Sequence, residues 1–154
     1  MTEFRRGVRI GIDPGRARVG VARVDPDGML AVPVETVPRD ERAIIRVLEI
    51  AAEYEPIEFV VGLPLNLRGD DTASTQDARD FAAELASRAA VPVRLVDERL
   101  STVTAHQALR QSGRSQKGSR KVVDQVAAVV LLQHAVDSEK STGAPAGEPV
   151  SLPE

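Results

Sequence analysis

The chain has 154 residues, a formal net charge of −3 and no cysteine, and 3% of its residues are aromatic. The lack of cysteine excludes disulfides, thiolate metal ligands and thiol nucleophiles, and so few aromatic rings argue against a nucleic-acid platform built on base stacking. The sequence starts without the apolar segment of a signal peptide, and no apolar run approaches the roughly 20 residues of a membrane span. We therefore expect a cytoplasmic domain with an aliphatic core.

Three strands are predicted first, over residues 8–13, 18–25 and 29–37. Apolar β-branched residues fill the first two, and Asp25-Pro26-Asp27-Gly28 predicts a turn before the third. Pro33 cannot donate a hydrogen bond to a neighbouring strand, which favours an edge position or an interruption for the third strand. Pro14-Gly15 predicts a tight turn that fixes Asp13 at the end of the first strand. Asp13 is then either a catalytic or metal-binding carboxylate on a rigid support, or a simple turn cap.

Helices and strands alternate along the rest of the chain. Helices are expected between Asp40 and Pro56, from Ser74 to Ala89, over residues 102–111 and over residues 121–136, and strands are expected over residues 59–64 and 91–96. Asp40 and Ser74 are the expected N-caps, and Asp77 is expected to reciprocate the Ser74 cap. Residues 112–121 are polar and basic and predict a mobile loop, and residues 138–154 predict a disordered tail outside a domain of residues 1–137.

This order of elements predicts an α/β domain with a mixed five-stranded sheet flanked by helices. The right-handed crossover rule makes the two later strands parallel to the first. Ligands of such sheets bind at the carboxyl ends of the strands. Asp13 and Glu98 both lie at such ends, on strands that could be neighbours.

Three acidic positions could share one site. Alternation along a strand lets only one of Asp97 and Glu98 face Asp13, and the pattern leaves open which. Asp124 begins an otherwise apolar helix, where a buried carboxylate would need a partner or a metal; exposure at the helix start, stabilised by the helix dipole, is the alternative. Mg²⁺ prefers such oxygen ligands, and paired metal ions can promote in-line phosphoryl transfer, so the acids favour phosphodiester hydrolysis.

A basic segment leads into Asp124. Its cations are Arg110, Arg114, Lys117, Arg120 and Lys121. The segment could contact phosphates without reading base sequence, or could be a solvated loop. Arg16 and Arg18, beside Asp13, could add phosphate contacts or pair with surface acids. His106 and His134 are expected to be surface or packing residues of helices rather than catalytic bases.

Four segments carry a family resemblance. They are Gly11-Ile12-Asp13-Pro14-Gly15 with Val19-Gly20-Val21-Ala22, Val60 to Asn66 continuing to Gly69, Val96 to Thr102, and Lys121 through Asp124 to Gln133. With them the chain, over residues 8–137, resembles the YqgF/RuvX family, the RuvC-like Holliday junction resolvases also described as pre-16S rRNA nucleases. The resemblance implies a ribonuclease H-like fold and a Mg²⁺ or Mn²⁺ site in which Asp13, Glu98 and Asp124 are the catalytic metal ligands. Pro14 departs from the small aliphatic residue expected after the first aspartate.

The leading hypothesis is a metal-dependent endonuclease acting on structured nucleic acid, with Asp13 bridging the metals. The resemblance implies two substrates, the 5′ end of precursor 16S rRNA and the Holliday junction, and junction resolution would need a homodimer with two symmetric sites. No membrane partner is expected. The alternatives are a noncatalytic ribonuclease H-like module that binds RNA or DNA, and a phosphotransferase or ATPase with an actin-like phosphate loop, which would need a second domain.

Overall fold

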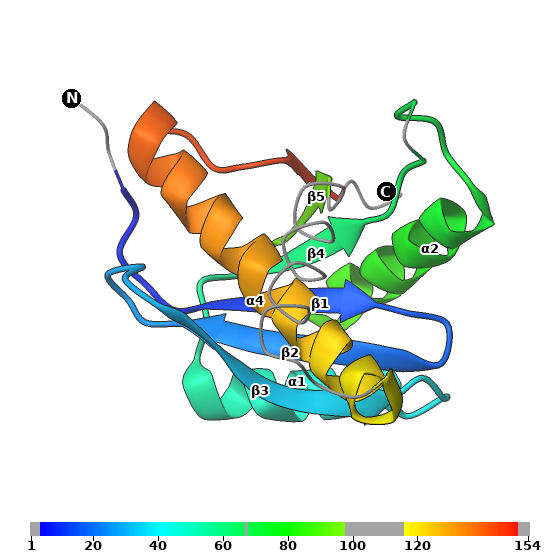
Figure 1. Cartoon of the computed structure of the whole chain (residues 1–154). Helices are drawn as coiled ribbons and strands as arrows, with labels where there is room; N and C mark the ends of the chain where they lie inside the picture. Colours follow the sequence, from blue (N-terminus) through cyan, green and yellow to red (C-terminus); the bar gives the residue numbers. More distant parts are fainter. Residues whose placement is uncertain (1–3, 67, 98–115, 151–154) are drawn as a thin grey trace.

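The computed structural model describes residues 4–66, 68–97 and 116–150, the last range without the side chains of residues 116–124. These residues form a six-stranded sheet with helices on both faces (Figure 1). In chain order the elements are β1 (Arg9–Pro14), β2 (Arg18–Val24), β3 (Ala31–Pro38), α1 (Ala43–Tyr54), β4 (Glu58–Leu63), α2 (Ala73–Arg88), β5 (Val93–Asp97), α4 (Gln116–Thr142) and β6 (Glu148–Pro149).

The strand order in the sheet is β3-β2-β1-β4-β5-β6. β1, β2 and β3 form an antiparallel meander, whereas β4 is parallel to β1 and β5 is parallel to β4. These pairings confirm the mixed sheet, the parallel later strands and the edge position of the strand that holds Pro33. The sheet has a sixth strand that was not expected, and β4 separates β1 from β5, so the strands of Asp13 and Asp97 are not neighbours.

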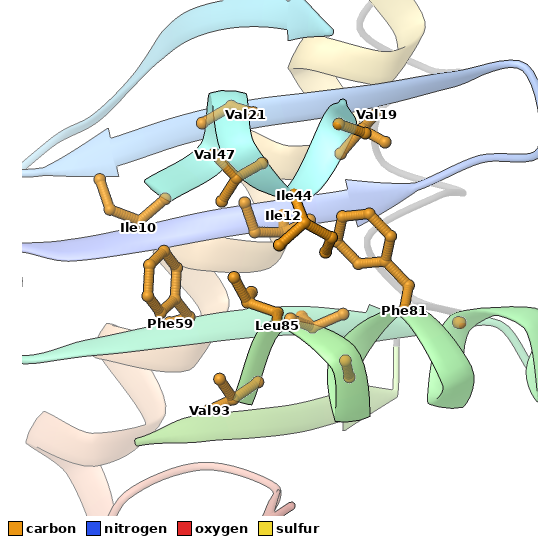
Figure 2. Packing of buried hydrophobic residues seen from close by; sticks show 14 of the residues in the cluster. Ile10, Ile12, Val19, Val21, Ile44, Val47, Phe59, Phe81, Leu85 and Val93 are labelled. Atoms are coloured by element: carbon orange, nitrogen blue, oxygen red, sulfur yellow. The ribbon is translucent and has the colours of Figure 1, made fainter. Parts of the chain in front are cut away.

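Two cores cover the two faces of the sheet. On one face, α1 and α2 pack against alternate residues of the strands, including Ile10, Ile12, Phe59 and Val61 (Figure 2). On the other face, α4 packs against Val60 and its neighbours through a row of small and aliphatic residues. The side chains alternate along β1, so that Arg9, Gly11 and Asp13 belong to the α4 face.

The helix caps differ from those expected. Asp40 accepts a hydrogen bond from the Arg42 backbone N–H at 2.9 Å and forms a turn before α1, which has no side-chain cap. At α2 the capping box joins Thr72 and Thr75, two residues before the expected start, and neither Ser74 nor Asp77 takes part. Thr72 is the last extended residue before the helix, and an N-cap needs that backbone conformation.

The carboxyl-terminal region is more ordered than its composition suggests. α4 already begins at Gln116, so residues 116–121 are helical rather than a loop, and it continues to Thr142. β6 then pairs with β5. The prediction of a disordered tail is therefore wrong for residues 138–150. Hydrogen bonds attach this segment to the domain: the Lys140 Nζ donates to the Gly28 carbonyl, and Arg94 donates to the carbonyls of Ala146 and Gly147. The helix expected over residues 102–111 lies outside the described residues.

A buried ionic cluster joins the end of α4 to the start of the sheet. The Arg9 Nη2 donates to the Glu139 Oε2 at 2.9 Å, and both side chains are buried. Arg5 bridges the two acids of the cluster, with its Nη2 at 2.6 Å from the Glu139 Oε1 and at 2.8 Å from the Glu58 Oε1. The cluster thereby fixes where α4 crosses β1 and β4.

Candidate functional site

Asp13 is half-buried near the carboxyl end of β1, on the face that α4 covers. Gly20 of β2 pairs with it directly. In β4 the register continues from the Ile12–Val61 pair and brings Gly62 to the same level. Glycines therefore flank Asp13 in both neighbouring strands, and neither adds a side chain to the space around the carboxylate.

The turn after Asp13 depends on Gly15. The Gly15 N–H donates to the Arg18 carbonyl oxygen at 2.8 Å, and a β-carbon on Gly15 would lie 2.6 Å from that oxygen. A side chain there would collide with backbone, so this turn requires glycine. Pro14 is buried and has a fixed φ, so the chain leaves Asp13 along a restricted path.

α4 runs across β1 towards Asp13. Glu139 of α4 meets Arg9, and Ala128 meets Gly11, where a β-carbon would lie 3.1 Å from the Ala128 carbonyl oxygen. Position 124 is one helical turn beyond Ala128 in the same direction. Figure 1 shows α4 crossing the strands obliquely, with its amino end, in yellow, near β3 at the end of the sheet to which β1 points. The backbone therefore brings position 124 to the end of the sheet where Asp13 lies; the Asp124 side chain is outside the description.

The two acids at the end of β5 differ in their relation to Asp13. Asp97 pairs with Leu63, which belongs to the core between the sheet and α1 and α2. Cross-strand partners share a face of the sheet, so Asp97 belongs to the face opposite Asp13. Glu98 lies outside the described residues. The alternation along β5 thus argues against Asp97 as a partner of Asp13.

Among the side chains that the structure describes, no group of three acids or histidines could hold a metal ion. Two of the three predicted ligands, Glu98 and Asp124, are outside that set, so the triad stays a prediction. The donors still suit a hard divalent cation, because Asp13 presents a half-buried carboxylate at a strand end and Mg²⁺ prefers oxygen ligands.

Those predicted cations that fall on described backbone lie around the same end of the sheet. Arg16 is exposed in the turn after Asp13, and Arg18 is half-buried at the start of β2. Lys117, Arg120 and Lys121 occupy the first turns of α4, with only their backbone described. Arg110, Arg114 and His106 lie outside the described residues. His134 is exposed on α4, which confirms it as a surface residue.

One pair near Asp13 was missed by the sequence analysis. Arg39 donates to the Gly15 carbonyl oxygen at 2.8 Å and also forms a two-pronged ion pair with Asp77 of α2. Arg39 follows β3, so no local pattern joins it to the turn after β1 or to α2. No helix in the described part of the chain has the length and apolar character needed to cross a membrane.

Comparison with known proteins places this arrangement in a family. The RuvX family model, described as Holliday junction resolvase, matches residues 7–138. A Clavibacter michiganensis subsp. michiganensis protein named "Putative pre-16S rRNA nuclease" is 54% identical over 147 residues, which cover 94% of this chain and 91% of the relative. A Streptomyces coelicolor protein of the same name is 56% identical over 152 residues, with coverage of 97% and 91%.

Solved structures share the fold. RuvC of T. thermophilus in complex with a Holliday junction substrate aligns with a TM-score of 0.58 at 23% identity, covering 92% of this chain and 98% of that one. A second structure of RuvC from Thermus thermophilus aligns with a TM-score of 0.54 at 22% identity. These alignments confirm the expected RuvC-like, ribonuclease H-like fold.

Proposed function

The chain belongs to the RuvX family, and we propose that it is a divalent-metal-dependent endonuclease that hydrolyses phosphodiester bonds in structured nucleic acid. One observation carries the proposal: the Gln125 Nε2, next to position 124 on α4, donates to the Thr36 Oγ1 of β3, and Thr36 pairs with Gly20, the strand partner of Asp13. The relatives named as nucleases and the RuvC-like fold support the same reaction class.

Asp13, Glu98 and Asp124 would hold Mg²⁺ or Mn²⁺. When bound, the metal would supply a Lewis acid that lowers the pKa of a water and stabilises the leaving oxygen. The turn at Gly15 supports Asp13 as the central ligand, because it fixes the backbone that directly follows the carboxylate. The alternation along β5 supports Glu98 over Asp97 as the second acid.

The proposed cations would hold the substrate by its backbone. Arg16 and Arg18 lie beside Asp13, and Lys117, Arg120 and Lys121 lie in the first turns of α4, near the same end of the sheet. Arg110 and Arg114 are the remaining cations that the sequence predicts to bind nucleic acid. Contacts to phosphates position a nucleic acid without reading its sequence, which suits an enzyme that recognises a structured substrate.

We propose the 5′ end of precursor 16S rRNA as the substrate, because the relatives that are more than half identical carry that name. The Holliday junction is the second candidate, because the family model is described as Holliday junction resolvase and the RuvC structure holds a Holliday junction substrate. Resolution of a Holliday junction would require a homodimer, since two strands must be cut symmetrically. The proposed place of action is the cytoplasm.

Parallel cleavage assays distinguish these substrates. The full chain is incubated with a 5′-extended 16S precursor and with a four-way DNA junction, each with Mg²⁺, with Mn²⁺ and with chelator. Metal-dependent cutting of the precursor alone supports the ribosomal role, and paired symmetric nicks in the junction support resolution. Metal-independent binding of both without any cutting would contradict the proposal and favour the noncatalytic binding module.

A further inference from the structure

We propose that Arg39 is a positioning residue that, together with Asp77, holds the β1–β2 turn in the geometry that Asp13 needs to bind metal. This inference rests on the proposed function. Arg39 itself lies just after β3, and its contacts with described residues are to the turn and to α2, so it acts through the backbone that follows Asp13.

Arg39 binds the turn at two points. Its backbone N–H donates to the Ala17 carbonyl oxygen at 3.0 Å, and its Nη1 donates to the Gly15 carbonyl oxygen at 2.8 Å. Gly15 is two residues from Asp13, so the guanidinium acts on the backbone directly beside the carboxylate. Both contacts fall on the turn itself, which the Gly15–Arg18 hydrogen bond closes.

The guanidinium is in turn held by α2. Its Nη1 and Nη2 donate to the two Asp77 carboxylate oxygens at 2.9 and 3.0 Å, and the plane lies over the buried ring of Phe81, 4.8 Å from its centroid. Figure 2 shows Phe81 reaching from α2 towards Ile12 of β1. The Arg39 and Asp77 side chains are 18% and 33% exposed, so the pair is partly shielded from water. Only arginine has the planar fork for these simultaneous contacts.

The same end of α2 also holds the end of β4. The Thr75 hydroxyl, buried in the first turn of α2, donates to the Pro64 carbonyl oxygen just after that strand. The first turns of α2 therefore anchor the carboxyl ends of β1 and β4 together, one through Arg39 and Asp77 and the other through Thr75. These are the strand ends at which the proposed metal site lies.

Metal affinity should be sensitive to this arrangement. Ligands need to be held within about 0.5 Å of the productive geometry, and loss of a supporting contact typically weakens metal binding or activity by roughly 10- to 100-fold. Lysine at position 39 keeps the charge, but it cannot contact Gly15 and both oxygens of Asp77 at once. Asparagine at position 77 keeps one acceptor oxygen and removes the charge.

The test compares Arg39→Lys and Asp77→Asn with the control variant Arg46→Lys. Arg46 makes an equivalent two-pronged pair with Glu35, at 2.8 and 2.6 Å, between α1 and the middle of β3. Three quantities are measured on the full chain: the Mn²⁺ dissociation constant by electron paramagnetic resonance, the melting temperature, and amide hydrogen exchange over residues 13–18.

We expect Arg39→Lys and Asp77→Asn to raise the Mn²⁺ dissociation constant by about 10-fold or more and to speed exchange in the turn, with the melting temperature close to that of Arg46→Lys. The inference is overturned if both variants bind Mn²⁺ like the parent chain, or if both simply unfold, which would make the pair a stability element. A parent chain that binds no Mn²⁺ would overturn the proposed function itself, and this inference with it.

Discussion

Gly11 of β1 lies against Ala128 of α4, so closely that a β-carbon at position 11 would come within 3.1 Å of the Ala128 carbonyl oxygen. From this crossing α4 continues to β3, where the Gln125 Nε2 donates to the Thr36 Oγ1 at 2.7 Å. Thr36 pairs with Gly20, which pairs with Asp13, so helix position 124 lies at the level of Asp13 along the sheet. A residue without a side chain thus sets the approach of the two elements that carry the proposed metal ligands.

Substitution of Gly11 by alanine should separate these elements. The added β-carbon would lie 2.8 Å from the Leu132 Cβ and would push α4 away from β1. We expect a loss of about 1–3 kcal/mol in the free energy of unfolding, together with weaker Mn²⁺ binding, because the same shift displaces position 124 from Asp13. Urea denaturation and a Mn²⁺ titration measure the two effects. An alanine variant with parental stability would contradict the close crossing.

The ionic cluster should contribute to stability rather than to catalysis. Glu139→Gln leaves the buried Arg9 guanidinium without its closest carboxylate, and we expect a loss of about 3 kcal/mol in the free energy of unfolding. The control is Asp27→Asn, which removes only the exposed pair with Arg6 and should cost less than about 1 kcal/mol. Denaturant unfolding of both variants checks this. Equal stabilities would show that the cluster does not hold α4 on the sheet.

The same cluster predicts a loss of stability in acid. Burial raises the pKa of Glu139, but the hydrogen bonds from Arg5 and the charges of Arg9 and Arg5 outweigh it and hold that pKa below its usual value. The hydrogen bond from Arg46 likewise lowers the pKa of Glu35. A carboxylate with a lowered pKa stabilises the fold fully above its unfolded pKa of about 4.3, and this contribution disappears as the pH falls through the lower folded value.

We therefore expect the free energy of unfolding to change little through these two groups between pH 7 and about pH 5, and to fall below about pH 4.3. Glu139→Gln should show a shallower fall, because the glutamine does not titrate. Denaturant titrations at a series of pH values give the two slopes. A variant with the acid slope of the parent chain would mean that Glu139 is not responsible.

Arg16 should contribute to nucleic-acid binding through phosphate contacts. It is exposed in the turn beside Asp13, so Arg16→Ala should weaken binding to a similar extent for different base sequences. It should also lower the slope of the logarithm of the binding constant against the logarithm of the salt concentration by about one phosphate contact. Arg88→Ala is the matched control, because Arg88 is exposed at the opposite end of α2, near the amino end of β5. Binding is measured in chelator over a range of salt concentrations. The same slope for Arg16→Ala and the parent chain would remove Arg16 from the interface.

Much of the fold could be predicted from local patterns. Alternate apolar residues such as Ile10 and Ile12 mark the buried face of a strand, and a run such as Phe59 to Leu63 marks a strand covered on both faces. The ionic cluster could not be predicted from such local patterns. Arg9 alternates with apolar neighbours as a solvent-facing residue does, yet it is buried because Glu139, 130 positions away, lies over it.

The candidate site was predicted only in part, for similar physical reasons. Turn chemistry and the end of an apolar run locate Asp13 at the end of β1. The order of strands depends on crossover connections, so the position of β4 between β1 and β5 was not predicted. The Arg39–Asp77 pair spans 38 positions and belongs to no helix or strand repeat. The two-residue strand β6 is too short for any periodic signal.

Cleavage by Asp13→Asn tests the central claim most directly. Asparagine preserves the shape of the side chain but removes the charge that the metal requires. With matched Mg²⁺ or Mn²⁺, we predict that Asp13→Asn lowers the rate of cleavage of the 5′-extended 16S precursor by about a thousandfold or more, with parental melting temperature and nucleic-acid binding. Asp27→Asn, which alters an acid in another hairpin turn, should cut like the parent chain. An Asp13→Asn chain that cuts at the parental rate would contradict the assignment of Asp13 as the central ligand.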